Sequence, residues 1–407
     1  MIPFSPPYID QDIIDEVVDS LKSGWITTGP KTKLFEKELA AYAGVNRVLC
    51  LNSATAGLEL ILRWYGVGEG DEVIVPAYTY CATANVVLHC GAKPVMVDTG
   101  QDFLIEVDKI EKAITSRTKA IIPVDIAGYP CDYASIMALA ERQDIKSKFK
   151  AAGVSQEKLG RILVMGDSAH SVGALYKGKK IGGQADFMVY SFHAVKNLTT
   201  AEGGAVCFGI DKYFDTEALY KELNIKILHG QTKDALSKTQ TGGWRYDVTE
   251  AGYKWNMPDV LAAIGLASFK KYEGYIIPRR KEIFAKYSAA FSKYKWAQIP
   301  EYINDIKESS YHLYPIRIYG ITEAQRDSII DKLFAAGISV NVHFQPLPLL
   351  SVYKNLGYKI EDFPVSFDNY SREISLPVYP QLSDEQIDKI TSSLVEIVEN
   401  EFAAEKV

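Results

Sequence analysis

The lysine at position 196 is the residue of this chain with the clearest chemical promise. The apolar run from Phe187 to Phe192 has the composition of a buried strand, and Lys196 follows it among polar and glycine residues. Loops at strand ends carry much of the chemistry of sheet proteins. An amine that is partly removed from water there has a lowered pKa and acts as a nucleophile toward aldehyde cofactors. Most lysines are solvated surface groups, so this interpretation needs support from other residues.

A carboxylate occupies a comparable place earlier in the chain. The apolar run 162–165 ends close to Asp167, which should therefore lie at the carboxyl end of a strand. A carboxylate in such a place stays charged only beside a partner, and a ligand's protonated ring nitrogen is one such partner. The alternative is a structural role in which Asp167 caps the following turn.

Small residues connect a short apolar strand, 48–51, to a predicted helix over residues 58–65. Within this connection Ser53, Ala54 and Thr55 leave backbone N–H groups open at a helix N-terminus, a geometry that binds phosphate. Plain N-capping by the Ser53 or Thr55 hydroxyl is the alternative.

Two loops carry aromatic residues that either pack or face a ligand. Tyr80 closes the loop 76–80, which follows a predicted strand. Trp25 and Thr28 belong to the Gly- and Pro-containing stretch 24–30, which is either a connector or a substrate-facing loop.

The elements that must position these residues alternate between strands and helices up to about residue 210. This alternation predicts a largely parallel sheet with helices on both faces, and in such sheets active groups gather outside the carboxyl ends of the strands. The turn at 53–55, Tyr80, Asp167 and the segment 191–196 all follow predicted strands. Their convergence predicts one site that holds a phosphate, an aromatic ring, an acid and an amine.

The second half of the chain has a different pattern. Residues 225–256 are rich in loop-forming residues, and a helix is predicted from Pro258 to about residue 293. Strands are predicted at 311–318 and 338–344, with an amphipathic helix after each of them. We therefore expect a large α/β domain over residues 1–255 and a smaller α+β domain over residues 256–407. The charged excursion 143–160 has no assigned role.

Composition limits the classes of function. The 407-residue chain has a net charge of −6 and a pI near 5.7, which argues against a nucleic-acid surface. Its five cysteines are scattered without a CxxC pair, as expected for free thiols in a reducing cytosol. We see no signal pattern at the N-terminus and no apolar run of the roughly 20 residues that span a bilayer. We therefore expect a soluble cytoplasmic protein that binds no membrane.

Several of these segments together resemble the motifs of the DegT/DnrJ family of PLP-dependent nucleotide-sugar aminotransferases. The resemblance covers nearly the whole chain and rests on 52–56, 76–80, 166–170, 191–204 and 252–256. It implies aspartate aminotransferase fold type I, a three-layer α/β architecture with a mostly parallel central sheet and a smaller C-terminal α+β domain. It also implies pyridoxal 5'-phosphate (PLP) as cofactor and no metal.

The resemblance implies a role for each motif. Lys196 would hold PLP as the internal aldimine, Asp167 would meet the pyridinium nitrogen, and His170 would lie near the phenolic oxygen of the ring. The remaining cofactor residues are Ser53, Ala54, Thr55 and Ser191 at the phosphate, Tyr80 stacked on the ring, and Asn256 lent to the phosphate by the partner subunit of a homodimer. Many relatives carry Asn where this chain has Lys254, and for this reason the role is assigned to Asn256. The substrate candidates are Trp25, Thr28, His193 and His343.

The implied activity moves an amino group from an amino acid, by family habit glutamate, to a nucleotide-linked keto sugar. A 4-keto-6-deoxyhexose is the expected acceptor, in surface polysaccharide or amino-sugar biosynthesis, and the choice between C3 and C4 stays open. Two alternatives are a PLP-dependent sugar dehydratase and a non-catalytic regulator. Dehydratases of this branch carry His in place of the lysine, so Lys196 argues against the first, and Lys196 with Asp167 argues against the second.

Overall fold

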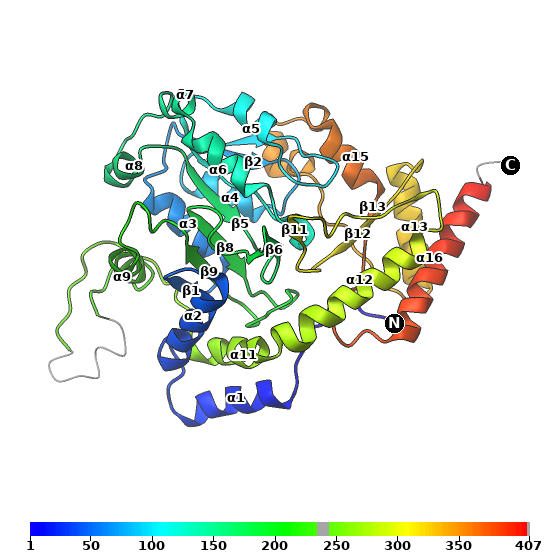
Figure 1. Ribbon diagram of the computed structural model, residues 1–407, viewed down its shortest axis with the longest axis horizontal. Helices are drawn as coiled ribbons and strands as arrows, with labels where there is room; N and C mark the ends of the chain where they lie inside the picture. Colours follow the sequence, from blue (N-terminus) through cyan, green and yellow to red (C-terminus); the bar gives the residue numbers. More distant parts are fainter. Residues whose placement is uncertain (234–243, 405–407) are drawn as a thin grey trace.

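The computed structural model describes residues 1–233 and 244–404 of the chain. Its centre is a seven-stranded sheet, called the large sheet below, with helices on either side (Figure 1). The strand order is β1-β9-β8-β5-β4-β2-β3, in which β9 runs antiparallel to both neighbours and the other pairs are parallel. The bounds are β1 Val48–Leu51, β2 Glu72–Pro76, β3 Lys93–Val97, β4 Thr118–Ile121, β5 Leu163–Asp167, β8 Phe187–Ser191 and β9 Gly204–Phe208. The predicted, largely parallel sheet is confirmed.

Alternating side chains of the large sheet enter two separate apolar clusters. Met188 and Tyr190 of β8 face one cluster, whereas Phe187 and Val189 face the other, as the two-residue period of a strand requires. The first cluster is covered by α2 Pro30–Ala43, α6 Tyr133–Glu141 and α11 Asp259–Lys270, and the second by α3 Ala54–Trp64, α4 Ala82–His89 and α9 Thr216–Lys226. Because both faces are buried, the strands read as continuous apolar runs.

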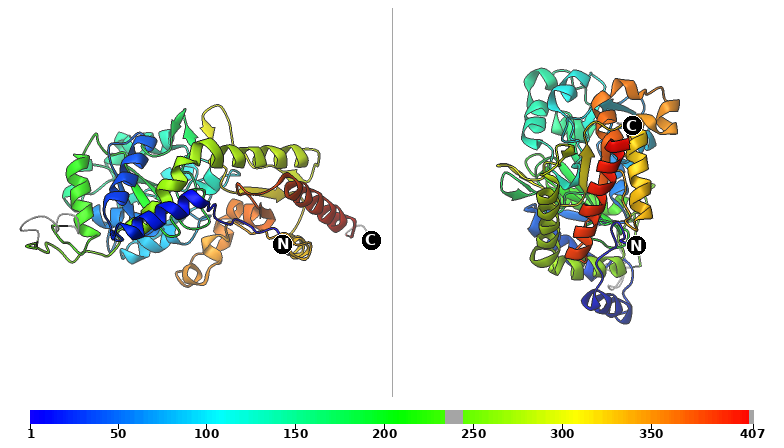
Figure 2. Two further views of the ribbon diagram at one scale, coloured as in Figure 1. Left: turned by 90° about the horizontal axis from the view of Figure 1, so that it is seen from below. Right: turned by 90° about the vertical axis from the view of Figure 1, so that its right-hand side faces the viewer.

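The segment from residue 277 onward builds a second, smaller sheet with its own apolar cluster. This small sheet is antiparallel, in the order β10-β12-β13, and α12, α13 and α16 pack on it. In Figure 2 α12 runs from the large sheet toward the small sheet, and α16 lies at the far end. The bounds are α12 Ile277–Phe291, β10 Ala297–Gln298, β12 Tyr314–Ile318, α13 Glu323–Ala335, β13 Glu373–Leu376 and α16 Asp384–Ala404.

Shorter elements complete the described chain. Three two-residue strands form a third sheet in the order β11-β6-β7, which joins residues 307–308 to residues 175–180. The short strands are β6 Leu175–Tyr176, β7 Lys179–Lys180 and β11 Lys307–Glu308. The other helices are α1 Gln11–Lys22, α5 Val107–Ala113, α7 Gln143–Lys146, α8 Val154–Leu159, α14 Ser351–Asn355 and α15 Pro364–Arg372, with short 3-10 turns at Ile126–Gly128, Leu347–Leu349 and Ile360–Asp362.

Some predicted elements differ from the structure. The strand predicted at 338–344 is wrong, because this segment makes only isolated bridges, Ile338 with Ile2 and Asn341 with Ser375. The long helix predicted after Pro258 is divided by a π-helical turn at Tyr272–Ile276. At the start of α13, Thr322 and Gln325 form a capping box, in which each side chain bonds to the backbone of the other residue.

The division of the chain after residue 255 stays a prediction. Part of the loop-rich stretch 225–256, residues 234–243, lies outside the described residues. None of the helices in the described ranges has both the length and the apolar composition needed to cross a membrane.

Candidate active site

A cavity of about 570 Å³ lies at the carboxyl ends of β5 and β8. Ten of the predicted site residues line it: Ser53, Ala54, Thr55, Tyr80, Asp167, His170, Ser191, His193, Lys196 and His343. The convergence expected for a parallel sheet therefore brings the acid, the amine and the small-residue turn to one place.

Asp167 is held rigidly at one wall of this cavity. Its backbone bonds to Pro123 and Asp125, while one carboxylate oxygen accepts from the Thr83 hydroxyl at 2.9 Å and the other from the Ala169 N–H at 3.2 Å. The side chain is buried, and this desolvation raises its pKa above the ordinary value. A cation placed in the cavity would stabilise the ionised carboxylate.

Lys196 lies on the loop between β8 and β9, which is closed by backbone hydrogen bonds from Phe192 to Gly203 and from Thr200 to Phe192. Burial lowers the pKa of the Lys196 amine to about 8, and the opposite charge of Asp167 acts in the other direction. The amine is therefore far closer to its neutral, nucleophilic form than a solvated lysine.

The turn from Ser53 to Gly57, called the phosphate turn below, opens α3. The Ser53 hydroxyl accepts from the Ala56 N–H at 3.0 Å, so it caps the helix as the alternative interpretation required. Within the described residues the N–H groups of Ala54 and Thr55 have no acceptor. Gly204 of β9 packs so closely that an added Cβ would lie 2.3 Å from the Ala54 nitrogen. The cap therefore leaves two N–H groups open in the same turn, and open N–H groups at a helix N-terminus are suited to an anion.

Two histidines lie against each other beside Lys196. The ring centroids of His170 and His312 are 4.4 Å apart, and Nδ1 of His170 is buried without a partner in the described structure. Nδ1 of His312 lies 2.9 Å from the side-chain oxygen of Asn197, the residue that follows the lysine. Burial lowers the pKa of both rings, so both are neutral.

His312 and Thr83 are site residues that the sequence analysis missed. His312 lines the cavity, and Thr83 donates a hydrogen bond to Asp167. Each of them lies between two apolar neighbours in the sequence. The one available signal was a histidine inside the predicted strand 311–318, a position where an unpaired polar ring is costly.

The N-terminal segment forms another part of the cavity wall. Ile2 pairs with Ile338, and the ring of Phe4 stacks on His343 with centroids 5.3 Å apart. The Ser5 hydroxyl donates to the carbonyl of Val195 at 3.2 Å, next to the lysine. Phe4 and Ser5 both line the cavity.

Three predicted residues lie outside the cavity and close to one another. The Asn256 amide donates to the Thr28 hydroxyl at 2.6 Å, and this hydroxyl donates to the carbonyl of Met257 at 2.6 Å. Trp25 packs on Gly29 of the same loop, with its indole N–H buried and unpartnered in the described structure. Asp259 fixes this loop by accepting from the N–H groups of Gly29, Lys31 and Thr32.

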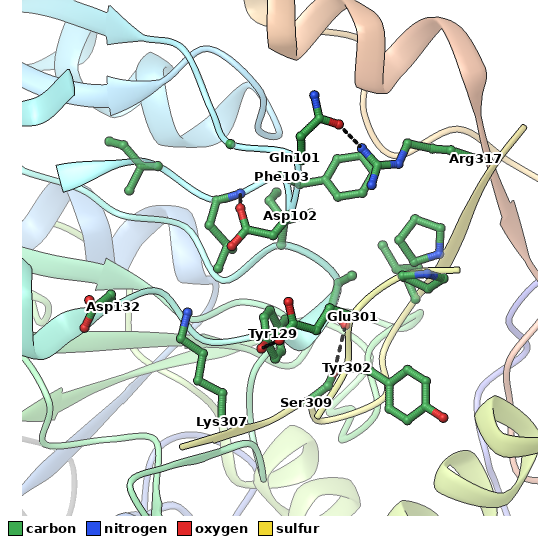
Figure 3. Close-up of a pocket in the computed structure, with 18 of the residues that line it drawn as sticks. Gln101, Asp102, Phe103, Tyr129, Asp132, Glu301, Tyr302, Lys307, Ser309 and Arg317 are labelled. Carbon is green, nitrogen blue, oxygen red and sulfur yellow. Dashed lines mark hydrogen bonds between the residues drawn. The ribbon is translucent and has the colours of Figure 1, made fainter. Parts of the chain in front are cut away.

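A second cavity, of about 670 Å³, lies between residues 100–108 and 298–317 (Figure 3). It contains none of the predicted residues. Its charged groups have partners of their own: Glu301 accepts from the Tyr129 hydroxyl at 2.7 Å, and Arg317 donates to Gln101 at 3.2 Å. The cavity around Lys196 is therefore the candidate active site.

Comparison with known proteins identifies the family of the chain. Residues 7–395 match the model of the DegT/DnrJ/EryC1/StrS aminotransferase family. The putative sugar aminotransferase Spr1654 from Streptococcus pneumoniae, in its PMP form, is 46% identical with a TM-score of 0.95, over 98% of this chain and 100% of that one. PseC from Helicobacter pylori, an aminotransferase of pseudoaminic acid biosynthesis, is 29% identical with a TM-score of 0.86, over 98% and 99% of the two chains. The spore coat polysaccharide biosynthesis protein SpsC from Bacillus subtilis is 36% identical over 98% of this chain and 97% of its own.

Proposed function

The chain belongs to the DegT/DnrJ/EryC1/StrS aminotransferase family, and on this premise we propose that it transfers an amino group from glutamate to a nucleotide-linked keto sugar. The observation that carries the proposal is the placement of Lys196, Asp167 and the phosphate turn around one cavity. An amine, a buried acid and an anion cradle are the groups that a phosphorylated pyridine aldehyde needs.

The residues of the cavity fit PLP, the cofactor of this enzyme class. Lys196 would bind its aldehyde carbon, Asp167 its ring nitrogen, and Tyr80 one face of its ring. The phosphate would take the open N–H groups of the phosphate turn and the Ser191 hydroxyl. Nδ1 of His170, which has no partner in the described structure, would be available to the phenolic oxygen.

When bound, PLP supplies an electron sink for the charge that develops on the amine-bearing carbon as its proton is removed. The chain's own part is to move that proton. Lys196, once its amine is free, would accept the proton from the carbon of the amino donor in the first half of the reaction and donate a proton to the sugar carbon that gains the amine in the second half. Burial, which lowers its pKa to about 8, makes it an effective base near neutral pH. Asp167 keeps the ring nitrogen protonated because a buried carboxylate needs a cationic partner.

We further propose a homodimer in which each subunit completes the other's site. Tyr80 lines the cavity but is 59% exposed, so one side of the ring position is uncovered in a single chain. Asn256, Thr28 and Trp25 lie outside the cavity of their own chain, and in the proposed dimer Asn256 would reach the partner's phosphate site. His193 and His343 line the cavity itself and would contact the sugar nucleotide.

The acceptor is proposed to be a 4-keto-6-deoxyhexose linked to a nucleotide, used for surface polysaccharide. The roles of SpsC in spore coat polysaccharide biosynthesis and of PseC in pseudoaminic acid biosynthesis support this class of product. The neutral rings of His170, His312 and His343 and the hydroxyls of the cavity suit an uncharged, polyhydroxylated sugar.

The test is an absorbance titration of the PLP-loaded protein. Glutamate should bleach the visible band of the lysine-bound cofactor, and one member of a panel of nucleotide-linked keto sugars should restore it. Lys196→Ala should show no such band, whereas Lys112→Ala, at an exposed lysine of α5, should behave as the wild type. A Lys196→Ala protein that still transaminates, or a wild type that glutamate does not bleach, would refute the proposal.

A further inference from the structure

His343 is joined to a buried polar chain behind the cavity wall. Its Nδ1 lies 2.9 Å from the hydroxyl of Ser375, a fully buried residue of β13. The other ring nitrogen, Nε2, lies beside Asn341, which lines the cavity as His343 does. The ring therefore has one nitrogen inside the protein and one on the cavity side.

The chain continues from Ser375 to a carboxylate that has no exposed surface. Oε1 of Glu373 lies 2.5 Å from the Ser375 hydroxyl, and Oε2 accepts from the backbone N–H of His343 at 3.0 Å. Glu373 thus contacts His343 twice, directly at the backbone and through Ser375 at the ring. The two-point contact fixes the ring relative to the carboxylate.

Other charged and titratable groups also face Glu373. Arg326 from α13 donates to the Glu373 carbonyl at 3.2 Å, and Arg317 from β12 and Tyr78 from the loop after β2 lie close enough to interact with the carboxylate. The two arginines and the Ser375 hydrogen bond favour the ionised form, whereas burial opposes it. Burial wins and raises the pKa of Glu373 to about 8, and it lowers the pKa of His343 to about 3.

A hydroxyl has one proton to donate, so this chain has two complete arrangements. With Glu373 ionised, Ser375 donates to Glu373, Nδ1–H of His343 donates to Ser375, and Nε2 is a bare acceptor. With Glu373 protonated, its O–H donates to Ser375, Ser375 donates to Nδ1, and Nε2 carries the proton. The imidazole is neutral in both arrangements. The Asn341 amide nitrogen, 3.5 Å from Nε2, donates to the bare nitrogen in the first arrangement, and in the second the amide turns its oxygen toward Nε2–H.

We propose that Glu373, through Ser375, sets whether Nε2 of His343 donates or accepts a proton in the cavity. Glu373 and Ser375 are positioning residues, and His343 is the group that touches the ligand. The inference rests on the proposed function only for the identity of that ligand, an oxygen of the keto sugar.

The proton transfer is balanced at every step. The Glu373 O–H breaks as a new O–H forms on Ser375, the former Ser375 O–H breaks as N–H forms on Nδ1, and the Nε2 N–H breaks as O–H forms on the sugar oxygen. Replacing a keto oxygen by an amine releases that oxygen as water, so a proton must reach it. His343 can supply the proton without becoming a buried cation.

The test reads the tautomer of His343 directly. In PLP-loaded protein with ¹⁵N-labelled histidine, the two ring nitrogens have different NMR shifts when protonated and when bare, and His343→Gln assigns the signals. Between pH 6 and 10 the Nε2 signal should change from the protonated to the bare position, with a midpoint near the pKa of Glu373. A His343 tautomer that does not change over this range would overturn the proposal.

Two variants and one control separate the relay from a general loss of structure. Glu373→Gln keeps the shape of the side chain but has no exchangeable acid, so the tautomer should be fixed at all pH values. Ser375→Ala should uncouple the ring from Glu373, and this variant tests the proposal in place of Glu373→Gln if the latter does not fold. Glu323→Gln removes a carboxylate 3.8 Å from the same Arg326, outside the relay, and should leave the tautomer change intact.

The same samples separate this proposal from the proposed function. Lys196 and Glu373 both have a pKa near 8, so the pH profile of turnover should keep the ionisation of Lys196 and lose that of Glu373 in Glu373→Gln, while the absorbance response to glutamate remains. A tautomer change without any transamination would leave the relay standing and refute the aminotransferase proposal. Transamination by a wild type with a fixed His343 tautomer would leave the aminotransferase proposal standing and refute the relay.

Discussion

The reactivity of Lys196 should follow a titration near pH 8 rather than near pH 10. The experiment varies the pH of the PLP-free protein and measures the reactivity of Lys196. Burial lowers the pKa of this amine from 10.5 to about 8. At pH 7 roughly one tenth of the amine is then neutral, against about 0.03% for a lysine of ordinary pKa, so its reactivity should be about 300-fold higher.

The rate of PLP capture should increase with pH because the neutral form of the amine is the nucleophile. Because the folded-state pKa is below the unfolded value, the folded protein gives up this proton first. The rate of PLP capture should therefore rise tenfold per pH unit below pH 8 and become level above it. Asp167→Asn removes the opposite charge, so it should lower the Lys196 pKa further and move the level region to lower pH.

Stopped-flow absorbance can measure the capture rate from pH 6 to pH 10. Pyridoxal, which has no phosphate to titrate, is the matched probe, and Lys196→Ala is the blank. A rate that keeps rising tenfold per unit between pH 8 and pH 10 would show that Lys196 behaves as a solvated lysine, and the reasoning from burial would fail.

Three further substitutions test how the site is supported. In the wild type Asp186 is 2% exposed and pairs with Arg161 at 2.8 Å, so Arg161→Met leaves a lone buried charge. We expect the unfolding free energy in urea to fall by about 3–5 kcal/mol, and an unchanged unfolding midpoint would contradict this. Gly204→Ala places a Cβ against the phosphate turn and should weaken PLP binding at least about tenfold in a fluorescence titration, whereas wild-type affinity would show that the turn adapts. Thr83→Val removes the 2.9 Å hydrogen bond to buried Asp167, which should lower the free energy of unfolding by about 1–3 kcal/mol and raise the Asp167 pKa. PLP should therefore dissociate faster, and an unaltered dissociation rate would count against a role for Thr83.

The large sheet and the centre of the site could be predicted because their signals are local. Buried parallel strands read as apolar runs, and Lys196 and Asp167 stand where two such runs end. The phosphate turn is equally local, since small residues and a serine cap fit a strand-to-helix connection.

The parts that could not be predicted depend on contacts between distant segments. The alternation of Glu373 and Ser375 with apolar residues in β13 is typical of a strand with one side in water, yet both side chains are fully buried. Their side faces His343 and two arginines, which only the folded chain brings together. The segment 338–344 fails as a strand for a related reason, because its pairing partners are single residues of two different segments.

The contacts of the first five residues have a practical consequence for anyone who shortens or tags the protein. Trimming this stretch would remove the stacked ring from His343 and the bridge at Ile338, and so open the cavity from that side. A purification tag is therefore better attached after α16, and a preparation clipped by proteases near Ser5 should be suspected first when cofactor binding is lost.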